Sequence, residues 1–387
     1  MIQRQLKIHM DSQQSFFLFG ARGTGKTTLL HQIFPSEEVL WIDLLQLEEQ
    51  DTFSRTPLEL ERRLRARKNP TRWVVIDEIQ KTPRLLDEVH RLIESDKVAF
   101  ALTGSSSRKL NRGAANLLAG RAFVHTLHPL CAAEIPDLDE RTAMRSGMMP
   151  MAFTLATDPE REQFLRAYAL TYIKEEIQEE QLVRRLPPFR AFLEVAAQAN
   201  GKIVNFLKMG RAAGVAPATI RSYFDILEET LIGFFLPAWH RSVRKRQLSS
   251  PKFYFFDCGV KRALDRTLTI DLAPGTGAFG EAFEHFLILE IRKCAIYRFP
   301  DWQFFYLNTG SDVEIDLIIE RPGLPLVLIE IKSADRVDER DVKHLASLGQ
   351  EMTEPLLLCA SREKQRRRIG SVLCLHWKDA LEELGLI

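Results

Sequence analysis

The chain has 387 residues, of which 45% are hydrophobic and 27% are charged, a composition typical of globular proteins with two or three domains. The net charge of +1 excludes a global field that would attract nucleic acid or an anionic membrane, so any such contact must use local patches. The sequence has no N-terminal apolar core, no apolar run of membrane-spanning length and no CxxC pair. We therefore expect a cytoplasmic protein that has no transmembrane helix and no disulfide framework.

The first predicted element is an apolar strand at 15–19, followed by a glycine-rich turn and a helix. The turn fits G-x-x-x-x-G-K-[ST], the P-loop, in its required strand–loop–helix setting. Its backbone N–H groups and the helix N-terminus hold phosphates, Lys26 reaches the β- and γ-phosphates, and the Thr27 hydroxyl binds magnesium. The sequence therefore predicts a site for ATP and Mg²⁺ formed by Gly20, Arg22, Gly23, Thr24, Gly25, Lys26, Thr27 and Thr28.

A second buried strand is predicted at 73–76, where the apolar run WVVI is followed by Asp77 and Glu78. Ligands bind at the carboxyl ends of strands in open α/β sheets. Asp77 is therefore expected to hold magnesium, and Glu78 to orient and deprotonate the attacking water. The alternative for Glu78 is a solvated charge at the end of a strand. Adjacent Asp77 and Glu78 at this position favour hydrolysis of a bound nucleotide over its mere storage.

Three more strands fit the same sheet: 39–45, 98–107 and one that follows Arg121. The second of them ends in small hydroxyl residues, so Ser105 and Ser106 are expected near the γ-phosphate, unless they form a plain turn. Arg121 is a candidate arginine finger, acting in cis or from a neighbouring subunit. An ordinary surface arginine is the alternative.

These motifs together resemble one family. The stretches GARGTGKTTLL, WVVIDEIQK, ALTGSSSRKL and LLAGRAFVHTLHPL look like the AAA-type ATPases of bacteria and archaea that carry a C-terminal domain of unknown function. The resemblance continues through PKFYFFDCGVKRAL and GEAFEHFLILEI, so it covers nearly the whole chain. It implies an AAA-type ATPase domain and a winged-helix segment in the middle of the chain.

The middle of the chain is predicted to be helical from about 160 to 235. Within it, 204–237 indicates helix, turn, helix and strand: Gly214 lies in the turn, and Pro217 starts the second helix. The predicted buried stripe is Ile220, Tyr223, Phe224 and Leu227.

The outer face of the second helix is more acidic than a DNA-reading helix requires, which favours a packing or interaction module. The chain also has two basic runs, 240–247 and 363–370. Each of them either contacts nucleic-acid phosphates or is a solvated charged loop. The first run carries Arg241, Arg244, Lys245 and Arg246.

Acidic residues alternate with apolar ones in the C-terminal stretch VEIDLIIERPGLPLVLIEIK. A turn at 321–324 would make it a hairpin with Asp316 opposite Glu330 and Glu314 opposite Lys332. Opposed carboxylates about 4.5–5.5 Å apart at their β-carbons repel each other, and a divalent cation would reverse that effect. A simple cross-strand ion pair on an exposed face is the alternative.

The pattern D-x13-E-x-K also resembles the metal site of the PD-(D/E)XK nuclease superfamily. The resemblance implies that Asp316 and Glu330 bind magnesium, that Lys332 positions or activates water, and that Glu284 supplies the helix acid. The implied chemistry is metal-assisted phosphodiester hydrolysis. Relatives with this fold also include binding modules that have lost catalysis.

We therefore expect an α/β protein of three domains: a P-loop ATPase with a mostly parallel sheet (1–135), a helical winged-helix domain (136–270) and a restriction-endonuclease-like α/β domain (271–387). Two functions remain open. One is an ATP-driven enzyme that binds and cleaves DNA. The other is a nucleotide-dependent switch that assembles with itself or with a protein partner and cuts nothing.

Overall fold

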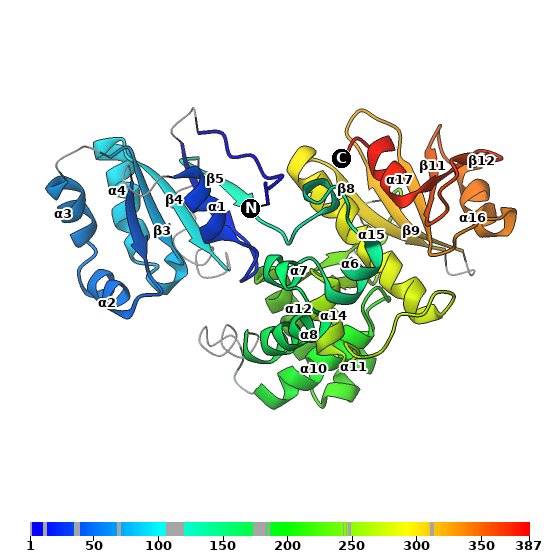
Figure 1. Ribbon diagram of the computed structural model, residues 1–387, viewed down its shortest axis with the longest axis horizontal. Coiled ribbons are helices and arrows are strands. Elements are labelled where there is room, and N and C mark those ends of the chain that lie inside the picture. The colour runs from blue at the N-terminus through cyan, green and yellow to red at the C-terminus, as the bar shows by residue number, and fades with distance from the viewer. Residues whose placement is uncertain are drawn as a thin grey trace. The chain divides into compact units, whose positions relative to one another are not determined.

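The computed structural model describes residues 2–10, 14–34, 39–67, 71–105, 120–172, 183, 186–242, 244, 246, 249–309 and 313–387. The described residues form two compact units (Figure 1). One unit, called here the ATPase unit, spans Leu6–Pro129 and includes the short segment Glu229–Ile232. The other, called here the C-terminal unit, combines the residues up to Gln5 with Leu130–Glu228 and Gly233–Ile387.

The ATPase unit is a parallel five-stranded sheet in the order β2-β3-β4-β1-β5. All five predicted strands are therefore confirmed, and so is the parallel sheet. The strands are β1 (Ser15–Phe19), β2 (Leu40–Asp43), β3 (Trp73–Asp77), β4 (Ala99–Gly104) and β5 (Ala122–Thr126).

Helices cover both faces of this sheet, which explains why its inner strands are apolar throughout. Leu29 and Leu30 of α1 (Lys26–Ile33) pack on one face against Phe16 and Leu18. The other face packs against three helices, α2 (Leu47–Arg55), α3 (Glu59–Ala66) and α4 (Leu85–Asp96).

The C-terminal unit begins with helices. They are α6 (Glu140–Ser146), α7 (Pro150–Thr154), α8 (Asp158–Ala167), α10 (Leu186–Gln198), α11 (Phe206–Ala213) and α12 (Pro217–Glu229), with 3-10 and π-helical turns at Ala132–Glu134 and Tyr168–Tyr172. The predicted helix–turn–helix is confirmed as α11 and α12: Gly214 ends α11 with a φ angle of 69°, and Pro217 starts α12. The predicted stripe is buried.

Two short antiparallel strands follow, β6 (Gly233–Leu236) and β7 (Lys252–Phe255), paired with Leu236 opposite Lys252. We call this pair the wing sheet. The next helix is α14 (Cys258–Leu264), which the Asp257 side chain caps by accepting a hydrogen bond from the Val260 N–H. Capping by a carboxylate satisfies an N–H group that the helix leaves unpaired.

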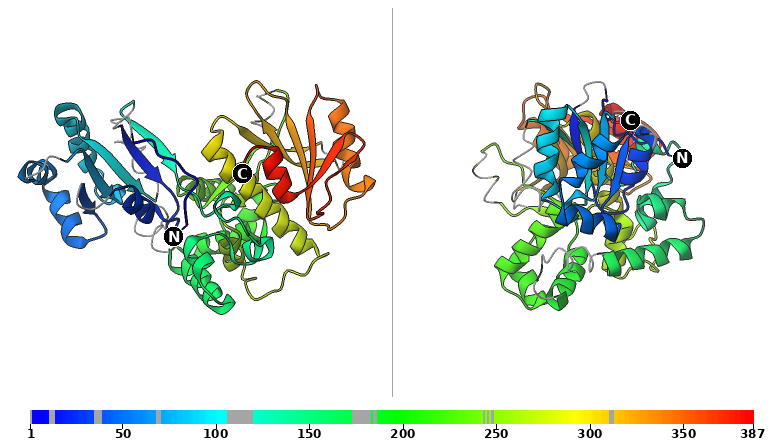
Figure 2. Two further views of the ribbon diagram at one scale, coloured as in Figure 1. Left: turned by 45° about the horizontal axis from the view of Figure 1, so that its top comes forward. Right: turned by 90° about the vertical axis from the view of Figure 1, so that its left-hand side faces the viewer.

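A six-stranded mixed sheet in the order β12-β13-β11-β10-β9-β8 completes the unit. Its strands are β8 (Gln303–Asn308), β9 (Glu314–Glu320), β10 (Val327–Lys332), β11 (Leu356–Ser361), β12 (Arg367–Ile369) and β13 (Val372–His376). Helices α15 (Gly277–Arg298) and α17 (Trp377–Glu383) pack on one face, and α16 (Glu339–Gln350) packs on the other. The left view of Figure 2 shows this sheet, coloured from yellow-orange at β8 to red at β13.

One hydrophobic core joins the predicted middle and C-terminal domains. It includes Met144 and Met148 near α6, Phe234 of the wing sheet, and the buried face of α15 with Phe283 and Phe286. The division predicted near residue 270 therefore falls inside a single compact unit. No helix in the described part of the chain combines the length and apolar character needed to cross a bilayer.

Candidate functional sites

The phosphate loop lies where β1 ends and α1 begins. Gly23 and Gly25 have φ angles of 77° and 94°, in the left-handed region that favours glycine. A β-carbon on Gly20 would lie 2.4 Å from the backbone oxygen of Leu127, so that position also requires glycine. The loop therefore presents backbone rather than side chains next to the start of α1, as anion binding requires.

Lys26 and Thr27 occupy the first turn of α1. The buried ammonium of Lys26 donates a hydrogen bond of 2.8 Å to the backbone oxygen of Gly20, which keeps it inside the loop. The Thr27 hydroxyl donates a hydrogen bond of 2.7 Å to Oδ2 of Asp77. One of these oxygens comes from the start of α1 and the other from the end of β3, and they lie side by side. Oxygen ligands of this kind are what Mg²⁺ prefers. The residues present therefore fit the predicted ion.

Asp77 ends β3 and is buried, with its second oxygen accepting a hydrogen bond from the hydroxyl of Thr103. Thr103 also accepts a 3.0 Å hydrogen bond from the backbone N–H of Glu78. Because β4 is the neighbour of β3 in the sheet, the Thr103 hydroxyl near its end holds both Asp77 and Glu78. Sequence reasoning did not single out Thr103, although its place at the carboxyl end of a predicted strand was a usable signal.

Glu78 adopts a left-handed backbone, with a φ angle of 60°, which is uncommon for a residue with a β-carbon. Its carboxylate accepts a hydrogen bond from the side-chain amide of Gln80, and the same amide donates a 3.1 Å hydrogen bond to the hydroxyl of Ser105. Gln80 and Ser105 are both buried. Gln80 was missed from sequence because nothing in the DEIQ stretch distinguishes it from a surface residue.

The remaining predicted nucleotide residues divide by exposure. Arg22 and Thr28 are exposed, whereas Thr24 is buried and its hydroxyl donates a 2.8 Å hydrogen bond to the backbone oxygen of Ala21. Thr24 therefore shapes the loop in this structure. Ser106, the second predicted sensor, lies outside the described residues.

Arg121 lies near the start of β1, at the end of the sheet away from the phosphate loop. It precedes β5, and Ala122 pairs with Ser15, at the beginning of β1. The phosphate loop follows the other end of β1, about 13 Å away along a five-residue strand. Arg121 instead makes a 2.6 Å ion pair with Glu94 of α4. In this arrangement Arg121 does not reach the phosphate loop of its own chain, so a role in trans and an ordinary surface position both remain as predictions.

The C-terminal hairpin has the predicted register. Gly323 provides the turn with a φ angle of 73°, and the paired residues run from Val327 opposite Ile319 to Ile329 opposite Leu317. One further step puts Asp316 opposite Glu330. The regular backbone pairing of β9 with β10 ends before this step. Here the Asp316 carboxylate accepts a 2.7 Å hydrogen bond from the backbone N–H of Ile331.

A β-bulge lies at the same point. Phe305 pairs with Ile318 and Leu307 with Ile315, so β9 has two residues where β8 has one. Asp316 is one of these two residues, and a bulge redirects the side chain it carries. Burial, together with the charges of Glu284 and Glu330, raises the pKa of Asp316 well above its usual range.

Glu330 and Lys332 form a 2.7 Å ion pair on β10. Burial raises the pKa of Glu330 despite this lysine, and its buried Oε2 atom has no hydrogen-bond partner among the residues that the structure describes. Burial acts to lower the pKa of Lys332, but Glu330 and Asp316 outweigh it and the pKa is raised. A second carboxylate, that of Glu330, is thus held close to Asp316, where a cation would relieve its charge.

Glu284, the predicted helix acid, faces the same cluster from α15. It accepts a 2.6 Å hydrogen bond from the hydroxyl of Tyr254 and lies 3.5 Å from the ammonium of Lys252. The donor set suits a hard divalent cation. Within the described residues, however, no group of three or more His, Cys, Asp or Glu side chains is arranged to hold a metal ion.

The basic runs have internal partners. Arg246 makes an ion pair with Glu320, with one hydrogen bond of 2.9 Å, and Arg241 donates to the backbone oxygen of Glu351. In the second run, Arg366 and Arg367 pair with Glu383 and Glu363. Lys245 lies outside the described residues. Arginines held this way are poorer phosphate contacts than the sequence suggested.

Three family models match the chain. Residues 12–136 match an AAA domain, residues 138–271 a domain of unknown function (DUF8612), and residues 279–377 another domain of unknown function (DUF4143). Residues 12–136 therefore carry an AAA-type ATPase domain with a nucleotide-binding P-loop, as the sequence resemblance implied.

Two relatives from mycobacteria are similar to this chain. They are the uncharacterized proteins Rv2008c of Mycobacterium tuberculosis and Mb2031c of Mycobacterium bovis, each 28% identical over 260 residues. The match covers 65% of this chain and 57% of each relative, so the chain spans little more than half of their length.

Similar solved structures include two proteins of Aeropyrum pernix. The ORC2 protein, in ADPNP-ADP complexes, is 12% identical and covers 66% of this chain and 88% of its own, with a TM-score of 0.35. The ORC1 protein in complex with DNA is 13% identical over 67% and 87%, with a TM-score of 0.27.

Proposed function

We propose that this protein binds and hydrolyses ATP at the phosphate loop. The observation that carries the proposal is the hydrogen-bonded chain from Thr27 through Asp77 and Thr103 to Glu78. It joins the expected magnesium ligands on α1 and β3 to the backbone N–H of the expected base through Thr103 of β4. Simple nucleotide storage would not require an acid held at the end of that chain.

The protein's groups divide the work as follows. Backbone N–H groups of the loop and the start of α1 hold the phosphates, and Lys26 neutralises charge on the β- and γ-phosphates. Thr27 and Asp77 would hold Mg²⁺, which supplies positive charge to the phosphate oxygens when bound. Glu78 accepts a proton from the attacking water, and Ser105 donates to the γ-phosphate.

The test is a pair of variants with separate readouts. Lys26→Ala should lose both nucleotide binding and hydrolysis. Glu78→Gln should keep ATP binding and lower kcat by about 100-fold or more, since it removes the base and little else. Glu94→Gln, an exposed acid in the same unit, is the control. Hydrolysis that persists in Glu78→Gln would exclude Glu78 as the base.

A second candidate function is Mg²⁺-dependent cleavage of DNA by the C-terminal unit, with α11, α12 and the wing sheet acting as a winged helix. Asp316 and Glu330 would hold the ion, and Lys332 would position the water. The specific observation in favour is the open end of the β9–β10 ladder, where two carboxyl groups of raised pKa lie at opposed positions beside Glu284.

Cleavage of labelled single-stranded, double-stranded and branched DNA tests this candidate, with Mg²⁺ or Mn²⁺ and with or without ATP. Cutting that is lost in Asp316→Asn would establish the nuclease, and its dependence on Lys26 would show control by ATP. If wild type cuts nothing, the alternative is a nucleotide-dependent switch. ATP-dependent self-association that DNA does not affect would then support a protein-binding role for the C-terminal unit.

A further inference from the structure

The chain leaves the ATPase unit directly beside the phosphate loop, through residues 127–134, called here the connection. The backbone N–H of Leu127 donates a 2.7 Å hydrogen bond to the oxygen of Phe19. The oxygen of Leu127 lies 2.4 Å from the position that a β-carbon on Gly20 would take. The oxygen of Gly20 in turn accepts the 2.8 Å hydrogen bond from the ammonium of Lys26. The position of Leu127 therefore limits where Gly20, and with it Lys26, can lie.

Three residues later the connection is fixed to α15 of the C-terminal unit. The backbone oxygen of Leu130 accepts a 2.6 Å hydrogen bond from the ammonium of Lys293. The backbone N–H of Ala132 donates a 2.6 Å hydrogen bond to Oε2 of Glu290. Only two residues separate Leu130 from Leu127, and one of them is a proline, whose ring fixes a backbone torsion. The connection therefore has an anchor at each end and little freedom between them.

Glu290 and Lys293 form a buried ion pair of 2.5 Å on one turn of α15. Burial acts to lower the pKa of Lys293, but Glu290 outweighs it and the pKa is raised. A buried ion pair adds little stability over apolar residues of the same size, and its remaining atoms need hydrogen-bond partners. Here those partners are backbone groups of the connection. The pair therefore holds the connection in one position.

The N-terminal residues are tied to the same connection. Oε1 of Glu134 accepts a 2.6 Å hydrogen bond from the backbone N–H of Gln5 and makes a 3.1 Å ion pair with Arg4. Oε2 of Glu134 accepts a 3.2 Å hydrogen bond from the backbone N–H of Cys131. Gln5 is the last residue before the ATPase unit begins at Leu6. One buried carboxylate thus fixes the chain both where it enters the ATPase unit and where it leaves it.

We propose that Glu290 and Lys293 are positioning residues for ATP hydrolysis, which act on the phosphate loop through the connection. The proposal rests on the ATP hydrolysis proposed above and adds to it a contribution from the C-terminal unit. The ammonium of Lys26 binds the β- and γ-phosphates before the reaction as well as during it. A displaced loop should therefore weaken nucleotide binding more than it slows the chemical step.

Steady-state kinetics of the full chain with ATP and Mg²⁺ tests this role. The double variant Glu290→Met with Lys293→Met replaces the ion pair by apolar side chains of similar length, a change that buried ion pairs often tolerate. It removes both hydrogen bonds to the connection. The KM for ATP should rise by about tenfold or more, the scale of one weakened hydrogen bond to a charged group, while kcat changes little.

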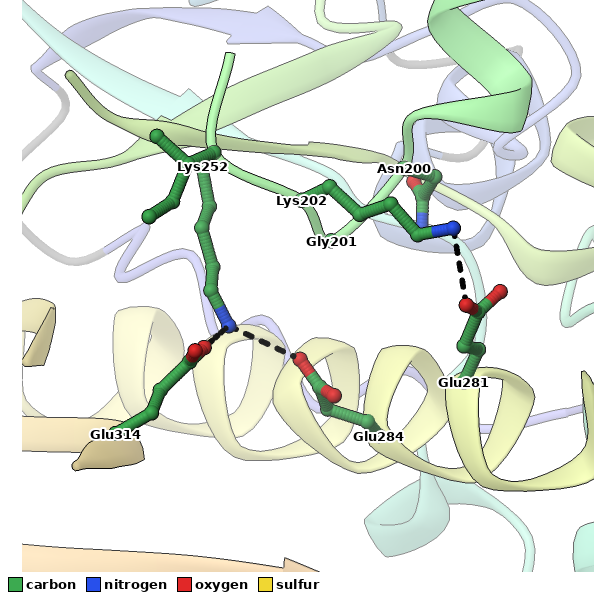
Figure 3. Close-up of a pocket in the computed structure, with 8 residues that line it drawn as sticks. Asn200, Gly201, Lys202, Lys252, Glu281, Glu284 and Glu314 are labelled. Atoms are coloured by element: carbon green, nitrogen blue, oxygen red, sulfur yellow. Dashed lines mark ion pairs between the residues drawn. The ribbon is translucent and has the colours of Figure 1, made fainter. Parts of the chain in front are cut away.

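Other ion pairs of α15 provide the control (Figure 3). The ammonium of Lys252, on β7, lies between Glu284 of α15 and Glu314 of β9, at 3.5 Å and 2.5 Å from their Oε1 atoms. Further along the helix, Glu281 makes a 3.0 Å ion pair with Lys202, and both side chains are exposed. Neither pair involves a residue of the connection. Glu281→Gln breaks an ion pair of the same helix and should leave KM and kcat unchanged.

A double variant whose KM and kcat both match wild type would overturn the proposal. A lower kcat with an unchanged KM would also overturn it, because a loss of folded protein alone gives that result. If the double variant does not fold, Glu134→Ala, which removes the carboxylate shared by Gln5 and Cys131, repeats the measurement with the same outcomes. Wild type that neither binds nor hydrolyses ATP would remove the proposed function as well, whereas an unchanged KM in an active enzyme removes this inference alone.

Discussion

The side-chain amide of Gln80 connects the carboxylate of Glu78 to the hydroxyl of Ser105. Glu78 is the last residue in the series of hydrogen bonds that begins at Thr27 and Asp77. Ser105 follows the neighbouring strand β4. Gln80 is 3% exposed, so it makes these bonds inside the protein. It therefore positions the expected base without being part of the phosphate loop.

Gln80→Leu should lower kcat for ATP hydrolysis by about tenfold to 100-fold, because Glu78 loses the donor that orients it. The KM for ATP should change little. Gln80→Asn keeps the amide on a shorter side chain and should restore part of the rate. Steady-state kinetics on the three proteins checks this, and an unchanged kcat in Gln80→Leu would show that the amide does not position Glu78.

The sequence predicted the parts of both sites that depend on local pattern. The phosphate loop follows from glycine spacing, and Asp77 from its place after an apolar run. The opposition of Asp316 and Glu330 follows from a single turn, because a hairpin register depends only on where the chain reverses.

The parts that were missed depend on tertiary packing. Arg121 was assigned without the strand order, and only the parallel pairing of β5 with β1 shows that it lies at the far end of the sheet. Lys252 lies in a different predicted domain from Glu284 and Glu314. Their contact depends on how the wing sheet packs against α15, which no periodicity in the sequence encodes.

Thr27 and Thr28 make a matched pair for testing the magnesium site. Both are exposed on the first turn of α1, and it is the Thr27 hydroxyl that donates to Asp77. Thr27→Val should raise the Mg²⁺ concentration for half-maximal hydrolysis by about tenfold to 100-fold, on the scale seen when groups that support a metal site are removed. Thr28→Val should change it much less. Equal effects of the two variants on the Mg²⁺ dependence would show that Thr27 has no specific role in metal binding.

Arg121→Ala should leave ATP hydrolysis by dilute, monomeric protein unchanged, because Arg121 lies away from the loop of its own chain. Loss of its exposed ion pair with Glu94 should cost about 0–1 kcal/mol of stability. The measurement is specific activity against protein concentration, with the state of assembly determined in parallel. A loss confined to assembled protein would support action in trans, and a loss in the monomer would contradict the observed position.

His285 should make the C-terminal unit sensitive to acid. Burial lowers its pKa to about 3, from an ordinary value near 6.5, although the ring shares a 2.7 Å hydrogen bond with the backbone oxygen of Phe255. Between pH 6.5 and pH 3 the His285 ring is protonated in the unfolded chain but neutral in the folded chain. Above pH 6.5 this histidine therefore costs no free energy of unfolding. As the pH falls from 6.5 to 3, the free energy of unfolding decreases by about 1.4 kcal/mol per pH unit.

Native-state hydrogen exchange of α15 amides measures this loss in the unit that contains His285. Between pH 6.5 and pH 5 the opening free energy should fall by about 2 kcal/mol. His285→Gln keeps a donor for Phe255 but has no proton to gain, so its opening free energy should lack this component. Parallel pH profiles in the two proteins would show that other groups cause the acid sensitivity.

Arg246 separates a structural role for the first basic run from a DNA-binding role. It pairs with the partly buried Glu320 and lies over the ring of Phe305 at 4.6 Å. Arg246→Ala should destabilise the C-terminal unit by about 1–3 kcal/mol, the range for hydrogen bonds to charged groups. Arg366→Ala breaks the more exposed pair with Glu383 and should cost less than about 1 kcal/mol. Urea unfolding compares the two variants. A stable Arg246→Ala protein with weaker DNA binding would contradict the structural role and return this arginine to the nucleic-acid interface.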